Sequence, residues 1–225
     1  MASMISIISI FSDATWRRLF IAFICVTGPI FLFINLADEV RDNDTLVFDE
    51  MILRTVNGFE TPLLDAVTVG LTQLGGVVGV TVLTVGLATL LYTRKMRQRA
   101  AILVTGVGGA AFLNILLKTV FQRDRPELWE RIVTENSFSF PSGHAMASSA
   151  LALSIIVIFW PTRWRWIAVI GSLVYVIIIA FTRLYLGVHY PTDIVAGWMV
   201  SAAWIGSIVV AVNYRKWKSL LHVKK

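Results

Sequence analysis

Apolar residues along this chain come in long blocks that are separated by short polar segments. A helix needs about 20 apolar residues to cross a hydrocarbon core of about 30 Å. The pattern therefore predicts an all-α polytopic membrane protein with six transmembrane helices and short interfacial helices, in a single domain over residues 1–225. The six blocks, which contain no charged residue, are about 19–37, 66–92, 100–117, 145–160, 167–182 and 194–212.

Two shorter stretches predict structure at the membrane surface. Within residues 38–64, apolar side chains recur at helical spacing from Phe48 to Val56, and Gly58 ends the pattern. Residues 1–11 are apolar but too short to span, so we expect them to lie at the interface. The first long block has the basic flank of a signal peptide, but it is long for one, and we expect it to be retained as a span.

Basic residues are distributed unevenly between the two sides of the predicted bundle. With six spans, the termini and segments 93–99 and 161–165 share one side, which carries thirteen of the twenty Lys and Arg residues. An excess of these residues marks the cytoplasmic side. We therefore expect both termini in the cytoplasm and segments 119–143 and 184–190 outside. This topology accounts for the net charge of +6, and we expect no nucleic-acid partner.

Ionisable residues stand at the ends of spans in three segments on the predicted outer side. Such groups are costly at membrane depth and usually face a bundle interior or a cavity, which suggests a shared site. Lys118 and Arg125 are seven residues apart, or two helical turns, and would share one face if the helix continues to Pro126. Two cations suit an anion, and a guanidinium fits phosphate oxygens. Alternatively, Lys118 extends toward lipid headgroups.

The second segment, from Pro141 to His144, directly precedes the fourth apolar block. Ser142 is expected to cap the helix there, and Gly143 allows the backbone to approach a ligand. The free amide groups of a helix N-terminus form an anion site. His144, in the first turn, is placed to donate or accept a proton.

The third segment runs from Arg183 to Asp193 and contains a second histidine. His189 and Asp193 are four residues apart, so on a helical turn the carboxylate reaches one imidazole nitrogen. That contact fixes the tautomer and leaves the other nitrogen as a nucleophile or base. A buried pair with a purely structural role is the alternative. Two of the three histidines in the chain lie in these segments.

Taken together, the three segments resemble the motifs of the type 2 phosphatidic acid phosphatase superfamily. That superfamily includes bacterial undecaprenyl-diphosphate and phosphatidylglycerophosphate phosphatases. Thr182 stands where the family commonly has serine, and because a hydroxyl is retained we expect little consequence. The matching residues are Lys118 with Arg125-Pro126, then Pro141-Ser142-Gly143-His144, then Arg183 with His189 and Asp193.

The resemblance implies a lipid phosphatase that acts through a phosphohistidine, with no metal and no other cofactor. It implies that His189 attacks phosphorus and that Asp193 orients it. His144 would protonate the leaving oxygen and then activate water. The phosphate would be held by Lys118, Arg125, Arg183, Ser142 and Gly143.

The lipid itself is left open by the resemblance. Arg123 and Arg131 lie near the first segment, and a contact with a second phosphate would favour undecaprenyl diphosphate as substrate. If the two arginines bind lipid headgroups instead, phosphatidylglycerophosphate or phosphatidate is the alternative. We expect a multi-pass protein of the bacterial inner (cytoplasmic) membrane, surrounded by membrane lipids. Its site would face the periplasm or exterior, and its oligomeric state is not indicated.

Two functions outside the hydrolases compete with this interpretation. Charged residues at membrane depth also line the path of transporters, although neither repeats nor broken helices are evident here. A haem-carrying membrane cytochrome would use His144 and His189 as axial ligands. Such ligands normally lie well within spans, whereas these two lie at span ends beside arginines.

Overall fold

A computed structural model describes the backbone of residues 13–222 and the side chains of residues 22–213. Every regular element in this part of the chain is a helix, which confirms the all-α class. The predicted interfacial segment 1–11 lies outside the described residues. In chain order the helices are α2 (Asp13–Arg41), α3 (Leu46–Asn57), α4 (Pro62–Thr72), α5 (Val77–Thr93), α6 (Arg97–Phe121), α7 (Gly143–Phe159), α8 (Arg165–Tyr185) and α9 (Pro191–His222).

The predicted number of six spans is not confirmed. Four helices are long and apolar enough to cross a membrane, namely α2 from Ala22, α6, α8, and α9 as far as Asn213. The bent pair α4 and α5 makes a fifth span if the two cross together. α7 is apolar but has only 17 residues. A helix of that length is about 26 Å long, which is less than the roughly 30 Å of hydrocarbon.

The second predicted span, 66–92, is wrong as a continuous helix. It is broken between α4 and α5, whose axes differ by 46°. Two glycines in the break approach neighbouring side chains closely. A Cβ atom on Gly75 would overlap the Ile179 side chain of α8, and one on Gly76 would lie 3.2 Å from Nε2 of His144. The break therefore brings the backbone against the start of α7, which a straight helix would not do.

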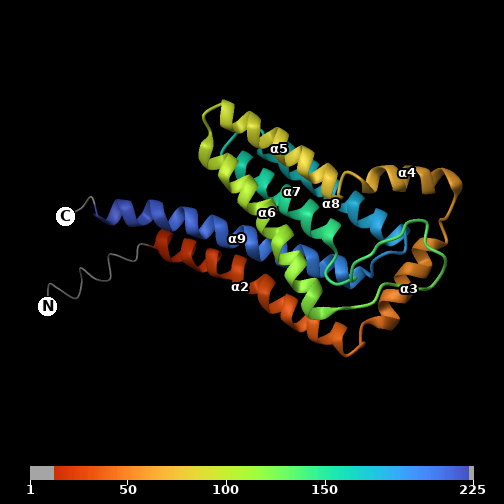
Figure 1. The fold of residues 1–225 in the computed structure, drawn as a ribbon. Helices are drawn as coiled ribbons and strands as arrows, with labels where there is room; N and C mark the ends of the chain where they lie inside the picture. Colours follow the sequence, from red (N-terminus) through yellow and green to blue (C-terminus); the bar gives the residue numbers. More distant parts are fainter. Residues whose placement is uncertain (1–12, 223–225) are drawn as a thin grey trace.

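At the centre of the bundle lies α7, which packs against α5, α6, α8 and α9 (Figure 1). Small residues allow membrane helices to approach closely. At Gly106 of α6 the approach is so close that a Cβ atom would meet the Ser154 hydroxyl at 2.6 Å. Neighbours on several sides thus fix the N-terminus of α7 inside the bundle. The buried small residues of α7 are Ala145, Ser148, Ser149, Ala150, Ala152 and Ser154.

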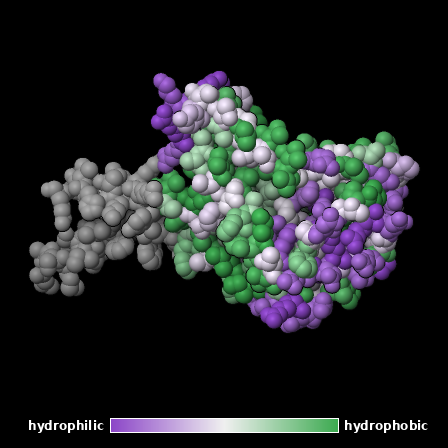
Figure 2. Space-filling model, viewed as in Figure 1, coloured by the Kyte–Doolittle hydropathy of each residue, from purple (hydrophilic) through white to green (hydrophobic). Residues whose placement is uncertain are grey.

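The short surface helix that the sequence predicted is present as α3, and Gly58 is its C-cap. Phe48 and Met51 are exposed, whereas Asp49 and Leu53 are buried. An apolar exposed face suits a helix that lies in the membrane interface. Figure 2 shows hydrophilic residues gathered at this end of the molecule and a largely hydrophobic surface over the helices beside it.

Candidate active site

The three motif segments meet at the end of the bundle that carries α3 and the long loop 122–142 (Figure 1). α8 ends at Tyr185, and the turn into α9 passes through Gly187, whose φ of +64° favours glycine. The backbone N–H of Ser142 donates to the carbonyl of Asp193 at 3.0 Å. This bond ties the start of α7 to the start of α9.

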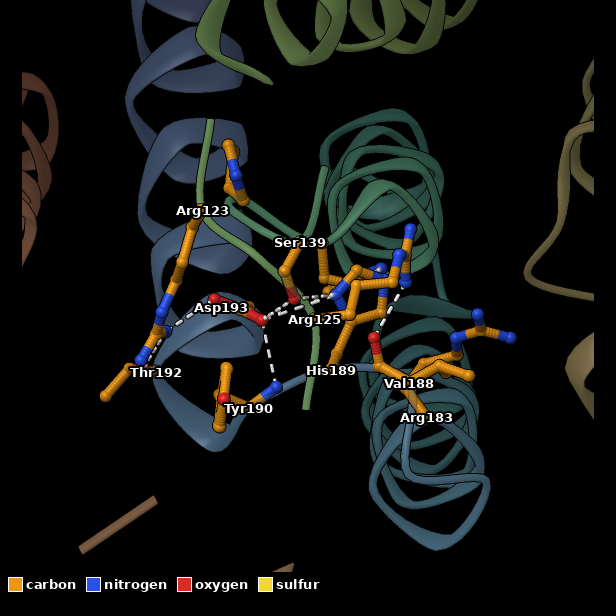
Figure 3. Close-up of polar contacts among 12 residues, drawn as sticks. Arg123, Arg125, Ser139, Arg183, Val188, His189, Tyr190, Thr192 and Asp193 are labelled. Carbon is orange, nitrogen blue, oxygen red and sulfur yellow. Dashed lines mark hydrogen bonds and ion pairs between the residues drawn. The ribbon is translucent and has the colours of Figure 1, made fainter. Parts of the chain in front are cut away.

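His189 and Asp193 lie side by side in the buried interior (Figure 3). Nδ1 of His189 is 3.4 Å from Oδ2 of Asp193, so the contact predicted from the four-residue spacing is confirmed. Ser139 bridges the pair: its hydroxyl lies 3.3 Å from Nδ1 and donates to Oδ2 at 2.5 Å. The backbone N–H of Tyr190 also donates to Oδ2, at 2.9 Å. The carboxylate is thus held from several directions.

The other ring nitrogen of His189 meets Arg125. Nη1 of Arg125 lies 3.2 Å from Nε2 and donates to the carbonyl of Val188 at 2.7 Å. A guanidinium has no acceptor, so the lone pair of the ring is on Nε2 and the proton is on Nδ1, toward Asp193. Burial, and after it the positive charge of Arg125, hold the pKa of His189 well below its ordinary value. The ring is therefore a neutral imidazole with a free nitrogen directed at a cation.

The helical arrangement predicted for Lys118 and Arg125 is wrong. α6 ends at Phe121, and Gln122 adopts a left-handed conformation with φ of +47°. Arg125 therefore reaches the site from the loop. The two cations still converge, because Lys118 Nζ and Arg125 Nη2 donate to the same Ser137 hydroxyl at 3.3 Å and 3.2 Å.

Arg183, at the end of α8, is buried between two polar groups. Nη1 donates to Thr72 Oγ1 at 2.8 Å, and Nη2 makes a close ion pair with Glu135, which also lies 3.8 Å from Arg125. Among the described residues Nε of Arg183 has no partner. Burial acts to raise the pKa of Glu135, but the two arginines outweigh it and hold that pKa below its ordinary value. Thr182 bonds back to its own helix at 2.7 Å.

The segment that begins α7 is supported by α6. Ser142 Oγ accepts a bond from an amide of the first turn at 3.4 Å, which confirms the predicted cap. Asn114 donates to the carbonyl of Pro141 at 3.0 Å, and a Cβ atom on Gly143 would lie 3.1 Å from Asn114 Oδ1. A side chain at this position would therefore displace Asn114 by a few tenths of an ångström. His144, in the same turn, faces the break between α4 and α5.

The guanidinium of Arg123, which the sequence suggested as a contact for a second phosphate or for lipid headgroups, is bound by two carboxylates. Its Nη1 donates to Asp193 Oδ1 at 2.7 Å, and its Nη2 donates to Asp49 Oδ2 at 2.9 Å. The guanidinium lies over the Tyr190 ring, 4.0 Å from the ring centroid (Figure 3). These contacts hold the guanidinium of Arg123 against the interior of the protein.

Several residues around the site were not predicted from the sequence, because they belong to no motif. Ser139 and Glu135 lie on the long loop, where polar residues are ordinary. Asn114 lies inside an apolar span. A polar side chain is unusual in such a span, and it was the one feature of the sequence that pointed to a role for Asn114.

The region that holds these residues also matches a family model, that of the PAP2 superfamily, over residues 99–217. The chain belongs to the PAP2 superfamily. Over 171 residues it is 30% identical to phosphatidylglycerophosphatase B of Bacillus subtilis, a match that covers 73% of this chain and 83% of that protein. It is 29% identical over 133 residues to an undecaprenyl-diphosphatase of Sulfolobus acidocaldarius, covering 56% of this chain and 61% of the relative.

A solved PAP2 structure has a similar fold. It is the crystal structure of a transmembrane PAP2 type phosphatidylglycerolphosphate phosphatase from Bacillus subtilis, with a TM-score of 0.76 and 25% identity. The match covers 85% of this chain and 97% of that one. The PAP2 region of the chain contains all three motif segments, from Lys118 to Asp193.

Proposed function

We propose that this protein is an integral membrane phosphatase that hydrolyses a lipid phosphate through a phosphohistidine intermediate. The setting of His189 is the observation that carries the proposal. Its Nδ1 lies 3.4 Å from the Asp193 carboxylate, and its Nε2 lies 3.2 Å from the guanidinium of Arg125. The carboxylate fixes the tautomer of the imidazole, and its free nitrogen is directed at Arg125, one of the residues proposed to bind the phosphate. Membership of the PAP2 superfamily favours this function over a transporter or a cytochrome.

The proposed reaction has two steps. In the first, Nε2 of His189 attacks phosphorus, the bond from phosphorus to the lipid oxygen breaks, and His144 gives a proton to that oxygen. Burial and the charge of Arg183 lower the pKa of His144 to about 3 in the free site, so in this mechanism the ring takes up its proton only when the negatively charged phosphate binds. In the second, neutral His144 takes a proton from water, whose oxygen attacks phosphorus and breaks the P–N bond. Asp193 stabilises the positive charge that develops on the ring of His189.

Charge stabilisation is assigned to side chains and to the start of α7. Phosphoryl transfer depends mainly on positioning and on compensation of charge. The ligands would be the cations Lys118, Arg125 and Arg183 together with the start of α7, where the Ser142 hydroxyl and the Gly143 amide are the proposed donors; the Ser142 amide is already bound to the carbonyl of Asp193. The buried Nε of Arg183, which has no partner among the described residues, supports an anion at this place.

With three cations at the site, the proposed reaction needs no metal. Phosphate release should persist in excess chelator, and orthovanadate, which mimics five-coordinate phosphorus, should inhibit it. Activity that is lost in chelator and restored by magnesium would contradict the proposed mechanism.

We place the site at the outer face of a bacterial cytoplasmic membrane, with both termini in the cytoplasm, an arrangement in which the bent pair α4–α5 and the short helix α7 each cross the membrane once. The asymmetry of Lys and Arg supports this orientation. A site at that level allows a headgroup to enter while its tails stay in lipid. Single cysteines at Gln98 and Glu130, in a Cys25→Ala background, test it with an impermeant thiol reagent. Glu130→Cys should be labelled from outside, and labelling of Gln98→Cys alone would reverse the orientation.

Phosphatidylglycerophosphate is the first candidate substrate, because the relative and the solved structure described above, both from Bacillus subtilis, are named as phosphatases of this lipid. Undecaprenyl diphosphate, which the sequence favoured, is the second candidate. Arg123 supports it less than expected, because two carboxylates bind its guanidinium. Arg131 lines a cavity of about 590 Å³ that Lys118, Arg123 and Arg125 also line. That position suits a second phosphate.

Phosphate release from purified protein, measured with phosphatidylglycerophosphate, undecaprenyl diphosphate and phosphatidate, tests the function and ranks the substrates. His189→Ala should abolish release from every lipid. Arg131→Ala should lower release from the diphosphate by about tenfold, the worth of one charge-assisted contact, and leave the monophosphates unchanged. An equal effect of Arg131→Ala on all lipids would count against the diphosphate site. Full activity of His189→Ala would refute the proposed mechanism.

A further inference from the structure

Asp49 is a carboxylate without exposed surface in a helix that lies at the periphery of the bundle. Its Oδ2 accepts hydrogen bonds from Arg123 Nη2 at 2.9 Å and from the Thr192 hydroxyl at 2.6 Å. Its Oδ1 accepts one from the Thr192 backbone N–H at 3.0 Å. A buried carboxylate is costly unless it is paired and hydrogen-bonded. Here α3 places one against the first turn of α9.

Arg123 connects Asp49 to the candidate site. Its Nη1 donates to Asp193 Oδ1 at 2.7 Å and to the Thr192 hydroxyl at 2.8 Å (Figure 3). One guanidinium is thus shared by two buried carboxylates, that of Asp49 from α3 and that of Asp193 from α9. The contact network spans residues far apart in sequence, and it includes an acid that lies outside the three motifs.

This network fixes the orientation of the Asp193 carboxylate. Arg123 binds one of its two equivalent oxygens, Oδ1, and the other, Oδ2, lies next to Nδ1 of His189. The backbone carbonyl of Arg123 also accepts from the Ser139 N–H at 2.8 Å. The same residue therefore holds the loop whose hydroxyl bridges the histidine and the carboxylate.

We propose that Asp49 and Arg123 are positioning residues for the reaction, which hold Asp193 so that the ring proton of His189 stays on Nδ1. The inference rests on the proposed function of His189. Both residues act through Asp193, on the side of the ring away from Arg125. Their loss should therefore reduce kcat and disturb the tautomer, with little effect on phosphate binding.

Kinetics of two conservative variants test this role. Asp49→Asn keeps an acceptor for Thr192 but has one oxygen fewer to accept from Arg123, whereas Arg123→Lys keeps the charge without the planar fork. We expect kcat to fall by about 10- to 100-fold, the range found for lost outer partners of functional ligands. KM and vanadate inhibition should change by less than about twofold. Glu50→Gln, on the same helix but paired with the exposed Arg54, should leave kcat unchanged.

A double-mutant cycle separates positioning from a general loss of structure. In an Asp193→Asn background, Asp49→Asn should lower kcat by a further factor of less than about two, because the carboxylate that Asp49 orients is gone. Full additivity of the two losses would overturn the inference, as would an Asp49→Asn enzyme with unchanged kcat. If Asp49→Asn does not fold, Arg123→Lys takes its place in the cycle.

Nitrogen-15 NMR of the full chain in detergent gives a readout that does not depend on turnover. The His189 signals, assigned with His189→Gln, should report the Nδ1–H tautomer in the wild type. In Asp49→Asn or Arg123→Lys they should report a larger share of the Nε2–H tautomer than in the wild type, although Arg125 still favours Nδ1–H. An unchanged tautomer in a folded variant would overturn the inference whatever the activity. A wild type that hydrolyses none of the lipids would count against the proposed function alone.

Discussion

Nη1 of Arg125 and Nε2 of His189 lie 3.2 Å apart in the buried centre of the site. The guanidinium is fixed by two carbonyls, those of Ser137 and Val188, each at 2.7 Å. A fixed cation at this distance disfavours a protonated ring and thereby keeps the nitrogen lone pair available. In the proposed reaction the same cation also attracts the phosphate that this nitrogen attacks. One residue thus serves both the nucleophile and its target.

Arg125→Lys should retain the charge but lose the fork that contacts His189, Ser137 and Val188 together. A single ammonium cannot occupy the three positions. We expect kcat/KM to fall by about 100-fold, as when one donor to a developing charge is lost. Arg54→Lys, at an exposed arginine of α3, is the matched control and should leave kcat/KM unchanged. Wild-type kinetics in Arg125→Lys would show that charge alone suffices at this position.

The pKa of His189 gives a second prediction, which NMR titration of the full chain measures directly. Burial and the charge of Arg125 both disfavour the protonated ring, so the ring should stay neutral well below its ordinary pKa of about 6.5. Arg125→Gln removes one of these two causes. It should move the pKa of His189 upward, but not fully to the ordinary value, because burial remains. A downward shift, or a wild-type pKa near 6.5, would contradict the assigned electrostatics.

Local spacing in the sequence was enough for some features of this site. The His189–Asp193 contact and the Ser142 cap depend on residues within one helical turn, and both are present in the structure. The Ser142 cap follows from helix geometry once α7 starts where expected. His189 precedes Pro191, the first residue of α9, so its contact with Asp193 follows from their short separation in sequence and not from a continuous helix. The all-α class followed equally directly, from apolar blocks that only helices use to this length.

Features that depend on neighbours distant in the chain were beyond the sequence. Lys118 and Arg125 do meet, but through Ser137 of the loop rather than along one helix. Gly75 and Gly76 are small enough for close packing, but only the position of α8 and of the start of α7 shows why the helix breaks there. Tertiary contacts override local helical preference at such points.

Glu135 occupies the place between Arg183 and Arg125 where the phosphate is proposed to bind. A bound phosphate must compete with this carboxylate for the two cations. Glu135→Gln should therefore tighten inhibition by orthovanadate, by about 3- to 10-fold given a carboxylate that is 27% exposed, in a high effective dielectric. Glu130→Gln, an exposed acid of the same loop, should leave the inhibition constant unchanged. Weaker inhibition in Glu135→Gln would show that the carboxylate assists the anion instead of competing with it.

Alanine substitutions at three glycines near the α4–α5 break distinguish an effect on stability from an effect on catalysis. A Cβ atom on Gly75 would overlap Ile179, so Gly75→Ala should destabilise the bundle by about 1–3 kcal/mol through overpacking. A Cβ atom on Gly76 would lie 3.2 Å from Nε2 of His144, while its backbone, at φ −76° and ψ 173°, accepts alanine without strain. Gly76→Ala should therefore keep stability and displace the imidazole by a few tenths of an ångström.

Such a displacement moves the proton donor away from the leaving oxygen, and we expect kcat of Gly76→Ala to fall about tenfold. Gly70→Ala is the control, because nothing lies within 4 Å of a Cβ atom there, and it should change neither property. Thermal unfolding in detergent and phosphate release, measured on all three variants, give the comparison. If Gly76→Ala is fully active while Gly75→Ala unfolds early, the break serves packing alone and the role proposed for His144 loses its structural support.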